Sequence, residues 1–137
     1  MDSHKDYKII YYKDNGTLPP EYHEELVIKI YSNGLIKIKK LKGYEDQIQF
    51  QHLLNLNTNE MLLFRHYLEK IELSKSYQIN APSKKMGSPT EYIEIFYHKN
   101  IIKWYYPDIL KEHDKIFLEI HNFIKQTIKN HLNENLF

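Results

Sequence analysis

The residues from 24 to 41 constrain the fold most, because apolar side chains alternate on both sides of one turn signal, Ser32-Asn33-Gly34. A two-residue Asn-Gly turn would mix isoleucine and lysine on each face of the hairpin. A three-residue loop instead pairs Ile30 with Ile36. Since a slip of one residue moves every side chain to the other face, the apolar pattern selects the register. We predict the three-residue loop, with one apolar face and an outer face that carries Lys29, Tyr31, Lys37 and Lys39.

A second hairpin is predicted over 92–106, where aromatic and β-branched residues flank a turn at Lys99-Asn100. A two-residue loop there pairs Ile95 with Trp104 and places on one face Ile93, Ile95, Tyr97, Ile102, Trp104 and Tyr106. The opposite face is semi-apolar and holds Glu94, Phe96, His98, Ile101, Lys103 and Tyr105. We expect Trp104 to be buried against the last helix, near Phe117 or Ile120.

Two more strands and one short edge strand are predicted from residue type. They cover 7–13, 47–56 and 77–80. The alternation in 47–56 predicts one apolar face made of Ile48, Phe50, His52, Leu54 and Leu56.

Two helices complete the pattern. Asn57 and Glu60 form a capping-box signal for a helix over 58–73, whose apolar stripe is Met61, Phe64, Leu68 and Ile71. A longer helix is predicted over 109–131, capped by Asp108, with a stripe made of Ile109, His113, Ile116, Phe117, Ile120, Ile124, Thr127 and Ile128.

This segregation of strands and helices predicts an α+β fold. We expect one domain over 1–137, an antiparallel sheet of about five to six strands with two helices packed on one face. Cysteine is absent and the N-terminal residues are polar, which favours a cytoplasmic protein. The abundance of Lys, Ile and Asn indicates an AT-rich genome, bacterial or phage.

The sequence offers no catalytic or metal motif. Eight histidines are present, but none are spaced as ligands on one element, so a metal site would need distant residues such as His52, His66 and His113. Glu24 and Glu25 point to opposite faces of a strand and do not form a catalytic pair. We therefore expect no metal, no cofactor and no enzyme activity.

Two surfaces are candidates for a partner. The first is the outer face of the 24–41 hairpin, where Lys29, Lys37 and Lys39 accompany Tyr31. Such a face suits an acidic protein or a nucleic-acid backbone, or it is only a solvated face whose lysines discourage edge pairing. Arg65 is the only arginine, which weakens the nucleic-acid interpretation.

The second candidate surface is the semi-apolar face of the other hairpin, with Phe96, Lys103 and Tyr105, and with His98 and Tyr92 beside them. Tyrosine is common at interface centres. The alternative is that 77–82 or 9–12 covers this face.

The run GTLPPEYHEELVIKI, the turn SNG and the later run MGSPTEYIEIFY resemble a family of small uncharacterised bacterial proteins. Those proteins begin with a strand, a Pro-Pro-Glu-Tyr loop and a hairpin. The resemblance implies a cytoplasmic α+β domain and supplies no activity.

The leading hypothesis is a non-enzymatic bacterial protein-binding module of the immunity or antitoxin kind. The alternatives are a nucleic-acid-binding domain that uses Lys29, Lys37 and Lys39, and a small ligand-binding domain or enzyme with a pocket under the Pro-Pro-Glu-Tyr loop. No membrane partner is expected. The oligomeric state cannot be derived from the pattern of residues.

Overall fold

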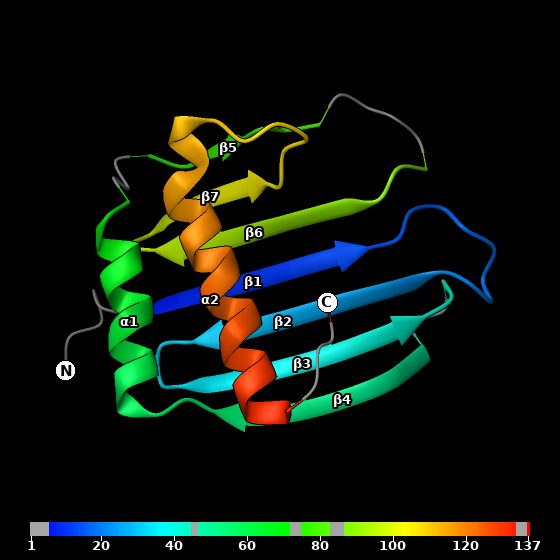
Figure 1. Ribbon diagram of the computed structural model, residues 1–137, viewed down its shortest axis with the longest axis horizontal. Helices are drawn as coiled ribbons and strands as arrows, with labels where there is room; N and C mark the ends of the chain where they lie inside the picture. Colours follow the sequence, from blue (N-terminus) through cyan, green and yellow to red (C-terminus); the bar gives the residue numbers. More distant parts are fainter. Residues whose placement is uncertain (1–5, 45–46, 72–74, 83–86, 134–136) are drawn as a thin grey trace.

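The structure is a computed structural model that describes residues 6–44, 47–71, 75–82, 87–133 and 137 (Figure 1). Seven strands and two helices follow one another in the order β1–β4, α1, β5–β7, α2. The strands are β1 (Tyr7–Asp14), β2 (Glu24–Tyr31), β3 (Leu35–Lys42), β4 (Gln47–Asn55), β5 (Tyr77–Ile79), β6 (Thr90–Tyr97) and β7 (Asn100–Tyr105). The helices are α1 (Thr58–Glu69) and α2 (Lys115–Leu132).

All seven strands form one sheet in the order β4-β3-β2-β1-β6-β7-β5. Neighbouring strands are antiparallel, except that β5 runs parallel to β7. The N-terminal strand β1 therefore lies in the middle, between the two predicted hairpins. The predicted α+β architecture is confirmed, with seven strands where about five to six were predicted.

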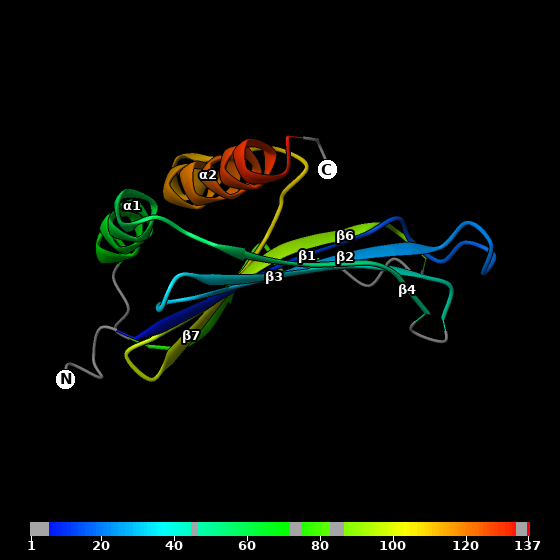
Figure 2. The ribbon, with the colours of Figure 1, turned by 90° about the horizontal axis from the view of Figure 1, so that it is seen from below.

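Both helices lie on the same side of the sheet (Figure 2). Every second residue of the inner strands faces them, and these residues form the core, with relative exposures of 0–7%. They are Tyr7, Ile9, Tyr11, Leu26, Ile28, Ile30, Ile36, Ile38, Ile93, Ile95, Tyr97, Ile102 and Trp104. The helices contribute Phe64, Leu68, Phe117, Ile120, Ile124 and Ile128. The opposite side of the sheet is covered by no element within the described residues (Figure 2).

The first hairpin has the predicted register. Ile30 pairs with Ile36 and Ile28 with Ile38. Gly34 ends the loop at φ +94°, a conformation that residues with a Cβ rarely adopt. The apolar residues of the predicted inner face, Leu26, Ile28, Ile30, Ile36 and Ile38, consequently all reach the core.

The second hairpin departs from the prediction by two residues. Its loop is His98-Lys99, and both residues have positive φ, as a type I′ turn requires. Ile93 therefore lies opposite Trp104, where Ile95 was predicted. A shift of two residues leaves every side chain on its predicted face, so core patterning cannot distinguish the two registers. The observed register places Glu94 opposite Lys103, a favourable cross-strand charge pair.

A register shift changes the predicted apolar face of β4. The pairing of β4 with β3 slips between Lys40 and Leu41, so Phe50 and Ile48 lie opposite these two consecutive residues. Such a bulge turns Ile48 to the uncovered side of the sheet, where it is solvent-exposed. His52 is also exposed, whereas Leu54 is buried.

Helix α1 begins as predicted. Asn57 accepts a hydrogen bond from the Glu60 backbone N–H, and the Glu60 carboxylate accepts one from the Asn57 backbone N–H. Phe64, Leu68 and Ile71 are buried. The helix ends at Glu69, with Lys70 as its C-cap, and is therefore shorter than the predicted 58–73; residues 72–73 lie outside the described residues.

Helix α2 begins later than predicted, after a short 3₁₀ turn at Glu112–Asp114. Ile109 is 76% exposed and His113 is also exposed, so neither belongs to the buried stripe, and Asp108 is not the cap. The start of the helix is set by the buried Asp114 carboxylate. That carboxylate accepts hydrogen bonds from Trp104 Nε1 at 2.9 Å, from Asn80 Nδ2 at 2.6 Å and from a backbone N–H at 2.9 Å. The spacing of apolar residues along a helix does not reveal these tertiary contacts.

Trp104 is fully buried and stacks on Phe117, with ring centroids 5.6 Å apart, as the prediction required. Trp104→Ala removes this stack, leaves a cavity and deprives Asp114 of one donor. We expect the free energy of unfolding to fall by about 3–5 kcal/mol, measured by urea denaturation. Ile109→Ala, at an exposed position, is the control and is expected to change it by less than about 0.5 kcal/mol. A loss below about 1 kcal/mol for Trp104→Ala would contradict the proposed role of this stack.

Candidate functional site: the free face of the sheet

The candidate site is the sheet surface that faces away from both helices (Figure 2). We call it the free face. Its central residues come from five strands and alternate with the core residues. They are Lys8, Ile10, Tyr12, Val27, Lys29, Tyr31, Lys37, Lys39, Tyr92, Glu94, Phe96, Ile101, Lys103 and Tyr105.

One row of the free face joins the two predicted surfaces. Lys8 on β1 pairs with Tyr31 on one side and with Phe96 on the other. Its ammonium group lies 5.8 Å from the centre of the Tyr31 ring and 5.6 Å from the centre of the Phe96 ring. A lysine at this distance is attracted by the π-electrons of both rings. The two surfaces are therefore parts of one continuous face.

A second row is made of tyrosines. Tyr12, Tyr92 and Tyr105 lie side by side on β1, β6 and β7. The Tyr12 and Tyr92 rings stack at 5.0 Å with 19° between their planes. Lys103 extends over this row, with its ammonium 4.1 Å from the centre of the Tyr92 ring. Partial burial lowers the pKa of Lys103, but the tyrosines and Glu94 outweigh that effect, and its pKa is raised. Lys103 is therefore positively charged at neutral pH.

The predicted lysines lie on the same face. Lys29 and Lys37 are directly opposite each other, and Lys39 is two residues further along β3. Like charges in opposite positions of a sheet are unfavourable. None of the three lysines forms an ion pair with a carboxylate of the described residues. The face thus keeps a positive potential over β2 and β3.

All seven predicted partner-binding residues lie on the free face. They are Tyr31, Lys29, Lys37, Lys39, Phe96, Lys103 and Tyr105. The alternative that 77–82 or 9–12 covers them is wrong for 77–79 and 9–12, which belong to strands of the same sheet, and Asn80 donates instead to Asp114 on the helix side. His98 lies in the turn. Sequence reasoning missed Lys8 and Tyr12 because they were assigned to a strand whose neighbours were unknown.

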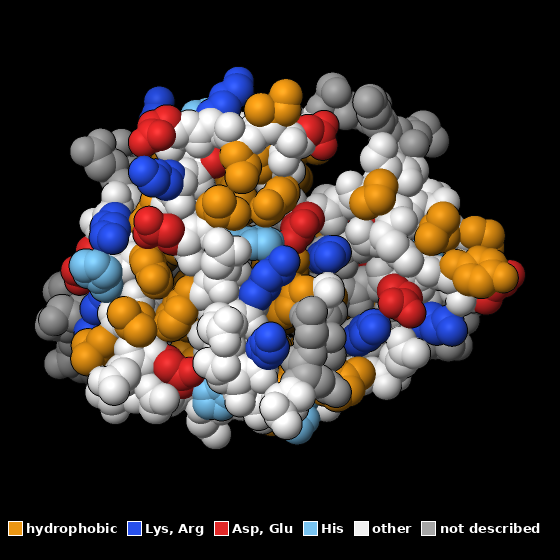
Figure 3. All heavy atoms as spheres, in the orientation of Figure 1, with side chains coloured by type: hydrophobic (Ala, Val, Ile, Leu, Met, Phe, Trp, Pro, Cys, Tyr) orange, Lys and Arg blue, Asp and Glu red, His pale blue; other side chains and the backbone are white. Residues whose placement is uncertain are grey.

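The helix side of the molecule has a different surface character. In Figure 3, acidic and basic side chains of the described residues are intermixed between small hydrophobic patches. A mixed surface of this kind has little potential of one sign. The free face differs from the helix side because its lysines and aromatic side chains lie together, so we take it as the candidate site.

A buried polar cluster lies between α2 and the sheet. The Glu91 carboxylate accepts a hydrogen bond from the Tyr11 hydroxyl and lies 2.7 Å from Nε2 of His121. Burial raises the pKa of Tyr11, so its hydroxyl remains protonated and is no nucleophile at neutral pH. His121 is buried beside the rings of Tyr11 and Trp104. The hydrogen bonds and ring contacts of this cluster hold α2 against the sheet.

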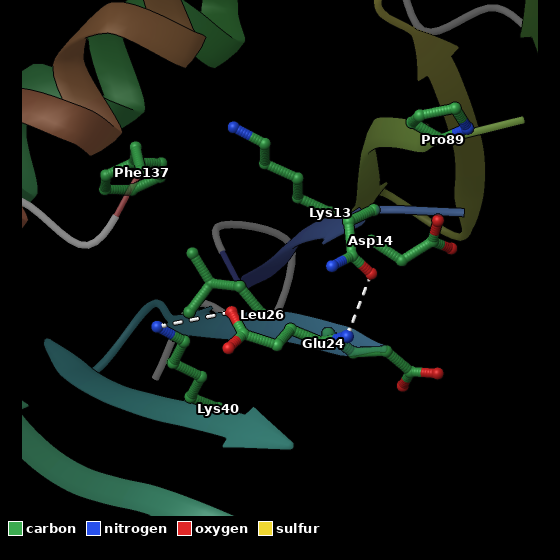
Figure 4. Close-up of a pocket in the computed structure, with 9 residues that line it drawn as sticks. Lys13, Asp14, Glu24, Leu26, Lys40, Pro89 and Phe137 are labelled. Carbon is green, nitrogen blue, oxygen red and sulfur yellow. Dashed lines mark hydrogen bonds and ion pairs between the residues drawn. The ribbon is translucent and has the colours of Figure 1, made fainter. Parts of the chain in front are cut away.

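A hollow of about 350 Å³ opens on the helix side, at the base of the 15–23 loop (Figure 4). Lys13, Leu26 and Phe137 line it, and Lys40 and Glu24 form an ion pair at 3.6 Å in its wall. The Pro-Pro-Glu-Tyr residues themselves do not line it. Its wall carries charges of both signs, so the hollow favours neither an anionic nor a cationic ligand.

No three His, Asp or Glu side chains come together as a metal site within the part of the chain that is described. His52, His66 and His113 therefore do not form a metal site.

None of the described helices has the length and apolar character needed to span a membrane. No protein-family model and no curated protein matches the chain. Its function has to be inferred from the surface.

The buried cluster predicts a pH dependence of stability. Burial raises the pKa of Glu91, but hydrogen bonds from His121 and Tyr11 outweigh it, so the pKa lies below its ordinary value of 4.5. A carboxyl group with a lowered pKa in the folded state stabilises the fold above its unfolded pKa, and that stability is lost as the pH falls through the folded value. Glu91→Gln is therefore expected to reduce the loss of unfolding free energy between about pH 6 and about pH 3.

The matched control is Glu21→Gln, which changes an exposed glutamate in the loop. It is expected to keep the wild-type pH profile, measured by urea denaturation at each pH. Identical profiles for Glu91→Gln and the wild type would show that this carboxylate does not contribute.

Proposed function

We propose that the protein is a non-enzymatic bacterial protein-binding module, of the immunity or antitoxin kind, whose free face binds an acidic protein. The observation that carries this proposal is the continuous row from Tyr31 through Lys8 to Phe96, which links the lysines to the tyrosines. A face of this composition provides both steering charge and aromatic contact area.

The positions of the lysines support a role beyond solubility. Lysine on an edge strand prevents unwanted pairing with other chains. Four of the eight residues of β3 are lysines, and β3 is an interior strand. The edge strand β4 has no lysine. Protection of an edge therefore does not explain Lys37 and Lys39, and attraction of an acidic partner does.

The aromatic residues of the free face favour a protein partner. Tyr92 and Tyr105 are held in place by Tyr12 and Lys103, so little side-chain entropy is lost when a partner covers them. The free face has no arginine to make bidentate contacts with phosphates, since Arg65 lies on α1. A folded acidic protein is therefore favoured over a nucleic acid.

We expect the double variant Lys37→Glu, Lys39→Glu to fold normally, with a change of unfolding free energy within about 0.5 kcal/mol. A glutamate at position 37 would face Lys29, which replaces a repulsive pair by an attractive one. The variant should associate with the partner more slowly, most clearly at low salt. Surface plasmon resonance over a range of salt concentrations measures this rate.

The test of the function is capture from a lysate of the native host with three immobilised proteins. These are the wild type, the free-face double variant, and Lys115→Glu, Lys129→Glu, which makes the same charge change at exposed sites on α2. The proposal expects one protein that the wild type and the α2 variant retain and the free-face variant loses. Equal capture by all three proteins, capture of nothing at micromolar concentration, or capture abolished by nuclease would overturn it.

A further inference from the structure

Apart from one bulge near its start, the edge strand β4 lacks the usual features that prevent pairing. It is nine residues long and contains no charged residue and no proline. Natural edge strands are usually short, charged, interrupted by proline or covered. The opposite edge strand, β5, follows this rule, because it has only three residues. Figure 2 looks at the molecule from the side of β4, and no other described element covers that edge.

The register shift opposite Lys40 and Leu41 limits the regular part of β4 to the residues from Phe50 to Asn55. A bulge near one end bends the strand, and the remaining six residues pair with β3 without a further shift in register. Leu53 is 57% exposed in this part of the strand. The regular part is therefore both accessible and long enough to pair.

We propose that β4 pairs antiparallel with β4 of a second copy of this chain. A two-fold axis perpendicular to the sheet is the operation that makes two copies of one strand antiparallel neighbours. This operation keeps the helices of both copies on the same side, so directly opposite residues share a face. An axis through His52 places Phe50 opposite Leu54 of the second copy on the helix side. On the other side, Gln51 lies opposite Leu53 of the second copy.

Charge identifies the second copy as the occupant. A two-fold interface sets a strand against the same strand of the second copy, so a strand with charges of one sign would repel itself. The uncharged sequence QIQFQHLLN avoids this repulsion. The free face cannot form such an interface, because the lysines of two copies would then meet. The edge of β4 is thus suited to self-association, whereas the free face is suited to a partner of opposite charge.

The pairing gives the assembly a second property. Because the two-fold axis is perpendicular to the sheet, both free faces point to the same side. Two sets of lysines and tyrosines are then presented together, and a partner with two acidic patches binds with avidity. The pairing itself does not depend on the proposed partner, so either proposal can fail while the other holds.

Analytical ultracentrifugation of the full chain over a range of concentrations tests the pairing. The wild type is expected to sediment as a dimer that dissociates on dilution. Leu53→Lys should shift the equilibrium toward the monomer, because it adds charge at the edge. Leu62→Lys, at a 54% exposed position on α1, is the control and should leave the dimer unchanged. A monomeric wild type at all concentrations, or equal effects of both variants, would overturn the proposal.

A second measurement remains valid even if Leu53→Lys unfolds the protein. The chain has no cysteine, so a single introduced cysteine can form a disulfide only with the same residue of a second copy. Opposite residues of antiparallel strands have Cα atoms about 4.5–5.5 Å apart, within the range of about 4.4–6.8 Å for disulfides. His52→Cys, which lies on the axis, should form a covalent dimer much faster than Leu53→Cys, which faces Gln51 of the second copy, or Leu62→Cys under mild oxidation. Equal rates at the three positions would contradict the pairing.

Discussion

The structure depends on one constraint: both helices pack on the same side of a seven-stranded sheet. The two-residue period of each strand then divides the chain into a core layer and a free face. Isoleucines dominate the core layer. No element of the described part of the chain covers the side chains of the free face. The free face is therefore a direct consequence of the helix placement, and its composition reflects requirements other than packing.

Polar contacts decide where α2 lies on the sheet. Hydrophobic burial is non-directional, so an apolar stripe allows a helix to slide by a turn. Asp114 removes this freedom at one end of α2 by accepting the Trp104 indole N–H, and Glu91 does so further along by binding His121. Both carboxylates have lowered pKa values because their hydrogen bonds outweigh the cost of burial. The helix and the sheet are thus joined at two defined points.

The sequence predicted the features that depend on which face of the sheet each side chain occupies. The prediction failed where two arrangements place the side chains on the same faces. The apolar pattern predicted the 24–41 register because the alternative would bury lysines next to Ile30. It could not select the loop His98-Lys99, because a two-residue shift keeps Trp104 in the core. The start of α2 was missed because Asp114 acts through residues far away in the chain. Seven residues of the free face were identified from the sequence as two separate surfaces. Lys8 was missed, because only the position of β1 places it between Tyr31 and Phe96 and joins the two surfaces.

The distribution of charge between neighbouring strands connects the two proposals. β3 carries four lysines inside the sheet, where they cannot prevent pairing, and β4 carries none at the edge, where they would. A sequence selected only for solubility would have the opposite arrangement. The observed arrangement separates two kinds of contact: an uncharged edge where identical strands can meet without repulsion, and a positive face that repels its own copy. Self-association through β4 therefore leaves the face that is proposed to bind the acidic partner uncovered.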